Sequence, residues 1–222
     1  MKKIIFAVFF ILIITAGVHS QNGTIREFTG EVELKHAGSA SFVAASVGAT
    51  VASNTIISTS FKSTAVIAIG SSVITVSPLT RLTLAEIQSA GNTESVNVNL
   101  QAGRVRVDVK PPAGTRANFT VQSPSATASV RGTTFEMDSQ NLFVNEGTVI
   151  VSGNTGPAVI VVGGNSTFSN AEGGPPADPV EVAAGSLAPP APVGSPAPET
   201  VSHSAETETG PTLISPRIKF AK

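Results

Sequence analysis

The stretch that decides the fold reads FTVQSPSATASVRGTTFEMDSQNLFVNEGTVIV and covers residues 119–151. Small or apolar side chains recur at every second position, which is the period of a β-strand because successive side chains point to opposite faces of a sheet. Gly132 and Gly147 fall between the strand-like runs, where a turn favours glycine. The stretch therefore predicts a meander of short, half-buried strands. Its apolar positions are Phe119, Val121, Ala126, Ala128, Val130, Phe135, Met137, Leu142, Val144, Val149 and Val151.

The same stretch carries two motifs, V-R-G-T-T-F at residues 130–135 and V-N-E-G-T-V at residues 144–149. They resemble the FecR domain, a family of bacterial extracytoplasmic β-domains. Three earlier segments are similar to further motifs of this family in the same order. The resemblance covers roughly residues 28–152 and implies an all-β domain that lies outside the cytoplasm. The three earlier segments are I-S-T with S-T-A-V-I-A-I-G-S-S-V at 57–73, P-L-T-R-L-T-L at 78–84 and L-Q-A-G-R-V at 100–105.

Strand-like segments separated by turn signals every ten residues or so continue through most of the chain, which is typical of a sandwich, barrel or solenoid-like roll. We expect an all-β fold, either an antiparallel β-sandwich or a coiled, solenoid-like β-roll of the FecR type. The absence of an exact internal repeat weakens the case for a regular parallel β-helix. A short helical turn is expected only near residues 84–89. Because Trp and Tyr are absent, we expect a core of Val, Ile, Leu and Ala with these bulky members: Phe28, Phe42, Phe61, Phe119, Phe135, Phe143 and Phe168.

The composition divides the chain into three parts. Residues 1–20 have two lysines, an apolar run and small residues before Gln21, the pattern of a cleaved secretory signal peptide, with an uncleaved signal anchor as the alternative. Residues 21–168 form the expected FecR-like β-domain, and residues 169–222 are rich in Pro and Ala, which predicts a disordered tail. The chain has no Cys, so it is not a lipid-modified lipoprotein. We expect a periplasmic or secreted protein with no stable membrane insertion after cleavage.

The supply of catalytic groups is poor. The formal net charge is −1 and there is no basic run, which argues against nucleic acid as a partner. His36 is the only histidine of the expected domain, and a surface role explains it better than a catalytic triad. Glu136, Asp138 and Glu146 could be assembled as paired carboxylates for glycoside hydrolysis, but an outward strand face explains the first two better. We expect no enzyme activity, no catalytic residue, no cofactor and no metal.

The motif residues Arg131, Gly132, Thr133, Phe135, Glu146 and Gly147 are expected to have structural roles. Arg131 has two interpretations. Its guanidinium either anchors a carboxylate, such as that of Glu146, or backbone carbonyls beside the Gly132 turn, or it faces a ligand or partner.

A second group of cations, Arg104, Arg106 and Lys110, is spaced so that the three side chains share one strand face. This face could bind an anion or a partner, and an ordinary solvated face is the competing interpretation.

These observations favour a secreted, non-enzymatic protein that acts as a protein-binding or scaffold module of the periplasm or envelope. An envelope or outer-membrane protein is the expected partner, and the oligomeric state stays open. The alternatives are a cell-wall or carbohydrate-binding module, which the lack of Trp and Tyr disfavours, and an accessory component of FecR-type signalling in iron uptake. The resemblance implies sensing of a transporter outside and control of a sigma factor inside. Because only Met1–Lys3 precede the apolar run, we expect no cytoplasmic sigma-binding region.

Overall fold

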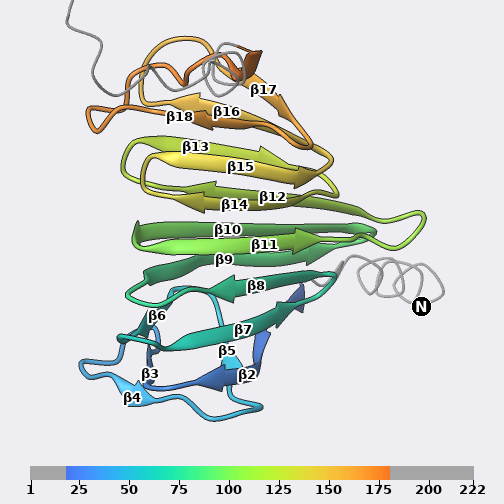
Figure 1. Ribbon diagram of the computed structural model, residues 1–222. Helices are drawn as coiled ribbons and strands as arrows, with labels where there is room; N and C mark the ends of the chain where they lie inside the picture. The colour runs from blue at the N-terminus through green and yellow to red at the C-terminus, as the bar shows by residue number, and fades with distance from the viewer. Residues whose placement is uncertain (1–18, 181–222) are drawn as a thin grey trace, which may run out of the picture. The chain divides into compact units, whose positions relative to one another are not determined.

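A computed structural model describes residues 19–180, which fall within one compact unit of the chain. Within these residues the strands form a sheet of ten strands, sheet A, and a sheet of eight strands, sheet B (Figure 1). Sheet A contains β1 (His19–Ser20), β3 (Val32–Lys35), β4 (Val43–Ala44), β6 (Thr55–Thr59), β9 (Arg81–Ala90), β10 (Thr93–Ala102), β12 (Arg116–Gln122), β13 (Ala126–Val130), β16 (Thr148–Gly153) and β17 (Val159–Val162). Sheet B contains β2 (Gly23–Thr29), β5 (Thr50–Val51), β7 (Thr64–Ile69), β8 (Ser72–Val76), β11 (Arg104–Val109), β14 (Thr134–Asp138), β15 (Asn141–Glu146) and β18 (Ser166–Phe168).

The chain passes back and forth between the two sheets while it advances in one direction. Sheet A has the order β17-β16-β13-β12-β10-β9-β6-β3-β4, with β1 added to β9, and sheet B has the order β18-β15-β14-β11-β8-β7-β2-β5. Strand pairs in the described residues are antiparallel except β10 with β12, which are parallel because the chain makes a full turn through β11 between them. This path confirms the expected all-β fold, a mainly antiparallel sandwich that is coiled like a solenoid.

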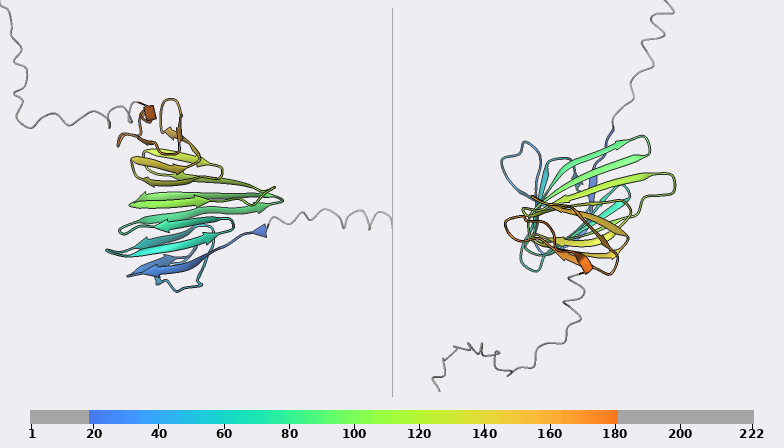
Figure 2. Two further views of the ribbon diagram at one scale, coloured as in Figure 1. Left: turned by 45° about the vertical axis from the view of Figure 1, so that its right-hand side comes forward. Right: turned by 90° about the horizontal axis from the view of Figure 1, so that it is seen from above.

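The strands rotate progressively along the stack, as the twist of β-sheets requires (Figure 2). Buried side chains from both sheets form one hydrophobic cluster. Within the stretch at residues 119–151, the alternating apolar side chains enter this cluster and the residues between them face outward. The period-two pattern thus fixes which face of each strand meets the other sheet.

The expected set of core phenylalanines is only partly right. Phe119 and Phe135 are fully buried, whereas the side chains of Phe61, Phe143 and Phe168 are exposed to 70%, 42% and 51%. Phe28 is half-buried and packs against the core, and Phe42 is also half-buried. The physical reason at Phe143 is the strand alternation itself. Its neighbours Leu142 and Val144 both point into the core, so Phe143 must point outward.

The helical turn expected near residues 84–89 was wrong, since these residues lie inside β9. Leu84 and Ile87 are both buried although they are three residues apart, a spacing that resembles a helix. The pairing with β10 explains it: the register shifts between Asn97 and Val98, so β9 carries one extra residue at a β-bulge.

The expected signal peptide lies outside the described residues except for His19–Ser20, which pair with β9. The expected tail lies outside them beyond residue 180. Residues 169–180 are described, and they contact the domain through backbone hydrogen bonds. The amides of Asn154 and Thr155 donate to Gly173 O at 2.8 and 3.2 Å, and Ala177 N donates to Phe168 O at 2.9 Å.

Candidate functional site

The V-R-G-T motif forms the corner at which the chain leaves β13 in sheet A and enters β14 in sheet B. Gly132 has a φ of 69°, a conformation that side chains disfavour. The buried Thr133 hydroxyl donates to Thr148 O at 3.0 Å, and Val109 N donates to Thr133 O at 3.0 Å. The corner is therefore tied to the strands on both sides of it.

The E-G-T motif forms the return corner, from β15 in sheet B to β16 in sheet A. Gly147 has a φ of 91°, and a Cβ at this position would lie 2.9 Å from Thr133 Oγ1 and 3.0 Å from Gly132 O. The two motifs are thus neighbouring corners in direct contact. The positive φ explains Gly132, close packing explains Thr133 and Gly147, and complete burial in the core explains Phe135.

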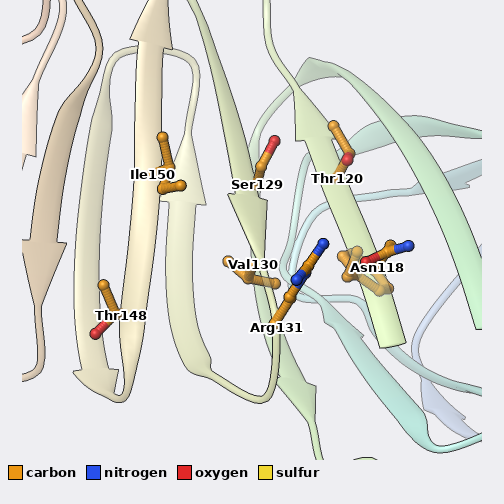
Figure 3. Close-up of a pocket in the computed structure, with 8 residues that line it drawn as sticks. Asn118, Thr120, Ser129, Val130, Arg131, Thr148 and Ile150 are labelled. Atoms are coloured by element: carbon orange, nitrogen blue, oxygen red, sulfur yellow. The ribbon is translucent and has the colours of Figure 1, made fainter. Parts of the chain in front are cut away.

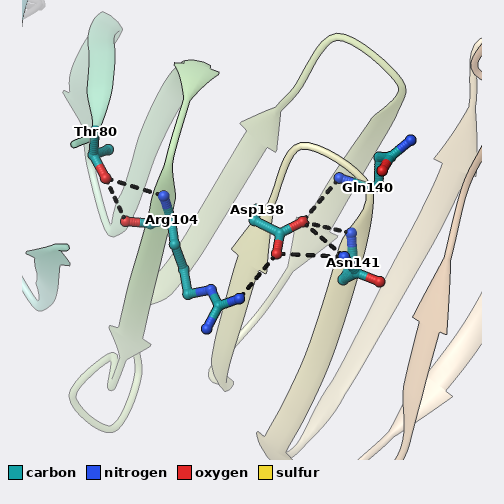
Figure 4. A network of polar contacts seen from close by, with 5 residues as sticks. All are labelled: Thr80, Arg104, Asp138, Gln140 and Asn141. Carbon is teal, nitrogen blue, oxygen red and sulfur yellow. Dashed lines mark hydrogen bonds and ion pairs between the residues drawn. The ribbon is translucent and has the colours of Figure 1, made fainter. Parts of the chain in front are cut away.

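The same arrangement of a threonine against a glycine recurs elsewhere in the stack, between Thr80 and Gly103. Thr80 Oγ1 accepts a hydrogen bond from Arg104 N at 3.0 Å and donates to Arg104 O at 3.1 Å (Figure 4). Gly103 has a φ of 88°, and a Cβ there would collide with Thr80. The Thr59 hydroxyl also bonds backbone groups of a neighbouring corner: it accepts a hydrogen bond from Thr80 N at 3.0 Å and donates one to Ser77 O at 2.7 Å. Threonine hydroxyl groups thus join neighbouring corners, because they form hydrogen bonds with backbone N–H and C=O groups that have no strand partner there.

The outer face of sheet B carries the three cations expected to share a face. Arg104, Arg106 and Lys110 do point outward from β11 and its end, because Val105, Val107 and Val109 between them are buried. Each has a carboxylate partner. The ion pairs are Arg104–Asp138 at 3.1 Å, Arg106–Glu136 at 2.6 Å and Lys110–Asp108 at 2.9 Å.

The three ion pairs balance the positive charge of Arg104, Arg106 and Lys110 and so limit what this face can bind. The hydrogen bond and charge of Asp108 hold the pKa of Lys110 above its ordinary value. Cations that already have carboxylate partners attract a further anion weakly, so the anion-binding alternative for this face gains no support.

Asp138 closes the turn between β14 and β15. Its Oδ1 accepts hydrogen bonds from Gln140 N at 3.0 Å and Asn141 N at 2.8 Å, while Oδ2 accepts from Arg104 at 3.1 Å (Figure 4). Partial burial acts to raise the pKa of Asp138, but the bonds from Gln140, Asn141 and Arg104 outweigh it and leave the pKa below its ordinary value. The carboxylate therefore acts as a turn-forming acceptor and stays charged at neutral pH.

A shallow hollow of about 630 Å³ lies on the outer face of sheet A, over β12, β13 and β16 (Figure 3). Its walls combine amide, hydroxyl and guanidinium groups with one large aliphatic side chain. Such groups can hydrogen-bond a polar ligand, and the exposed side chains contain no aromatic ring. The hollow is lined by Asn118, Phe119, Thr120, Ser129, Val130, Arg131, Thr148 and Ile150.

Exposed apolar side chains gather at the C-terminal end of the stack, on both sheets. On sheet A they are Ile150, Ile160 and Val162, exposed to 51%, 64% and 49%. On sheet B they are Phe143 and Phe168, which lie on the neighbouring strands β15 and β18. Exposed apolar patches on a soluble domain commonly mark interaction sites.

The comparison with known protein families gives one match. Residues 55–150, from the start of β6 into β16, match the FecR protein family. Over these residues the chain is similar to a FecR domain. The five motif segments read from the sequence fall within this match or overlap it, so the resemblance is confirmed. No curated protein matches the chain.

Two crystal structures of a candidate anti-sigma factor from Parabacteroides distasonis ATCC 8503, at 2.50 and 1.65 Å resolution, are similar to this chain. Each is 17% identical with a TM-score of 0.45 and covers 58% of this chain. The match takes in 62% and 63% of the two neighbours, so this chain spans less than two thirds of their length. These values are too low to transfer a function.

The FecR motif arginine does not make the ion pair that we considered for it. Arg131 and Glu146 are both exposed, and no ion pair joins them in the described part of the chain. The Arg131 side chain instead lies over the hollow of sheet A, beside Asn118 (Figure 3). Its motif position is thus not explained by packing in the way that those of Thr133 and Gly147 are.

The sequence analysis missed the exposed apolar end of the stack. The signal was present, because Phe143 and Ile150 each stand between two residues that the same pattern assigned to the core. Among residues 19–180 there is no group of three or more His, Cys, Asp and Glu side chains placed to hold a metal ion. No helix within that range is long and apolar enough to cross a membrane.

Proposed function

We propose that this protein is a secreted, non-enzymatic component of the bacterial envelope that works by binding another protein, as an accessory of FecR-type signalling. The FecR domain supports the link to signalling, since this family is regulatory in character. The expected signal peptide supports a place in the periplasm or outside the cell. The partner in this proposal is an envelope or outer-membrane protein.

The observation that carries the proposal is the exposed apolar end of the stack. Among the large exposed hydrophobic side chains of the described residues, half lie on β15 to β18, on the two faces of one end. Burying one such side chain on binding contributes roughly 1.5–3 kcal/mol before the entropic cost of association. A few of them together can therefore supply most of the affinity of a protein complex.

The test is capture of the partner by the tagged full-length protein from bacterial envelope extract, followed by direct binding of the identified partner in purified form. We expect one envelope protein to be enriched. Its affinity should fall at least tenfold in the double variant Phe143→Ser/Phe168→Ser. Phe61→Ser is the matched control, because Phe61 is also exposed but lies at the corner between β6 and β7. Equal affinity of the two variants, or capture of no envelope protein, would contradict the proposal.

A second candidate function is binding of cell-wall or other carbohydrate, and the hollow of sheet A favours it. Arg131 with the amide of Asn118 and the hydroxyls of Thr120 and Ser129 offers donors and acceptors that suit a hydroxyl-rich ligand. The test is retention of the protein on isolated peptidoglycan, compared with an Arg131→Ala variant. Retention that requires Arg131 would support this function, and enrichment of one envelope protein without retention would rule it out.

A further inference from the structure

The sheets end in four edge strands, and three of them are protected against pairing. β4 and β5 have two residues each. β18 has three residues and is covered by the segment after it, where Thr167 Oγ1 donates to Ala177 O at 2.5 Å and Ala177 N donates to Phe168 O. β17 has four residues, and within residues 19–180 no strand pairs with its outer side (Figure 1).

β17 also lacks the residues that usually protect an edge. Natural proteins place Lys, Pro, a bulge or a covering segment on such strands to prevent pairing with another chain. β17 reads Val159-Ile160-Val161-Val162, with no charge and no proline. Val161 points into the core, while Ile160 and Val162 are exposed to 64% and 49%. Ile150 stands directly opposite Ile160 on β16, so the outer face beside the edge is apolar as well.

The charges around this edge are of one sign. Residues 132–180 contain no Lys or Arg. Glu146 is exposed next to Gly163, which follows β17, and Glu172 is exposed next to Gly173, which bonds to the turn before β17. Arg131 is the cation of the hollow that Ile150 also lines. A second copy of this edge would bring like charges together, whereas a basic segment would be attracted.

We propose that the free edge of β17 binds an extended segment of the partner protein, in which about four apolar residues are flanked by Lys or Arg. This proposal rests on the protein-binding function above and names its surface. The segment adds a strand to sheet A through backbone hydrogen bonds, its apolar side chains pack beside Ile160 and Val162, and its basic ends face Glu146 and Glu172. β17 lies beyond the residues that match the FecR family.

The experiment uses the full-length protein and a synthetic peptide, Lys-Arg-Ile-Val-Ile-Val-Arg-Lys, followed by amide hydrogen exchange and by fluorescence anisotropy. We expect the amides of residues 159–162 to become protected, and the affinity to fall as salt is raised. A peptide with Glu in place of each Lys and Arg should bind at least tenfold more weakly.

Substitutions in the protein test whether the peptide binds at β17. Ile160→Lys should weaken peptide binding at least tenfold, because it removes an apolar contact and repels the basic peptide. Val47→Lys is the matched control, with 66% exposure at the other end of the stack. Since Ile160 is exposed, the variant should fold, and Val162→Lys provides a second substitution if it does not. Equal affinity of Ile160→Lys and Val47→Lys, protection that leaves residues 159–162 unchanged, or self-association through β17 would overturn the proposal. If the partner captured from the envelope binds Ile160→Lys normally, the edge site fails while the protein-binding function stands.

Discussion

Replacing Gly147 by Ala tests whether the contact between neighbouring corners stabilises the domain. The new Cβ would lie 2.9 Å from Thr133 Oγ1 and 3.0 Å from Gly132 O, closer than side chains normally approach. Holding a non-glycine residue in the left-handed region costs about 1–2 kcal/mol. If Thr133 moves away, its hydrogen bond to Thr148 O is lost, at a further cost of about 1–3 kcal/mol for a buried group left unpaired. The free energy of unfolding should therefore fall by about 2–5 kcal/mol.

Gly164→Ala is the control for this substitution. Gly164 has a φ of 84°, close to the 91° of Gly147, but a Cβ there would have no atom within 4 Å. The control carries the conformational strain without the collision, so it should lose only about 1–2 kcal/mol. Both variants reduce the entropy of the unfolded chain equally, so that effect cancels in the comparison.

The assay is urea denaturation followed by circular dichroism, with the midpoint and slope fitted for each variant. With a slope of about 2 kcal/mol per molar urea, Gly147→Ala should lower the midpoint by roughly 1–2.5 M and Gly164→Ala by about half of that or less. Equal midpoints for the two variants would contradict the proposed role of this contact, because the collision with Thr133 would then contribute nothing to the loss of stability.

Three further substitutions test individual contacts. Thr80→Val removes the hydroxyl that bonds both backbone groups of Arg104 and should cost about 1–3 kcal/mol in thermal or urea unfolding; an unchanged stability would contradict this role. Arg106→Ala breaks the exposed pair with Glu136 and should cost less than about 1 kcal/mol, with a smaller effect in 1 M salt; a loss that salt leaves unchanged would argue against an ion-pair effect. Asp138→Asn should destabilise the domain at pH 7, and the difference from wild type should shrink as the pH falls below about 4, because a carboxylate with a lowered pKa contributes its stability above that range and loses it on protonation. A difference that persists at pH 2 would contradict the assigned cause.

The sequence predicted the local β-structure well where the alternation was strict. The apolar positions Ala126, Ala128 and Val130 of the stretch at residues 119–151 lie in β13, and Leu142 and Val144 lie in β15. Every second side chain of these runs is buried, as the pattern requires. The assignment of each strand to one of two sheets did not follow from the sequence, because alternation fixes the face of a strand and leaves its neighbours open.

The roles of the motif residues were predicted unevenly. Gly132 and Gly147 were expected at turns because glycine accepts a positive φ, and they occupy such turns. The contact of Gly147 with Thr133 was not predictable, since it requires two corners to lie side by side. The position of the Arg131 side chain could not be predicted from the sequence. A long charged side chain can reach several partners, so its motif position alone did not reveal that it lies over the hollow.

Most of the proposed binding surface lies beyond the residues that match the FecR family, although Phe143 and Ile150 fall inside the match. The FecR match ends at residue 150, whereas β17 and the exposed Phe168 come after it. Close packing explains Thr133 and Gly147 at the corners inside the match. The exposed apolar side chains at the end of the stack lack such an explanation within the domain, and binding of a partner supplies one.

The most direct test of the proposed binding surface is amide hydrogen exchange of the full-length protein with and without the envelope partner that it captures. We expect protection on binding to concentrate in β17 and in the neighbouring residues of β16 and β18. Protection confined to the hollow over β12 and β13, with β17 unchanged, would contradict it.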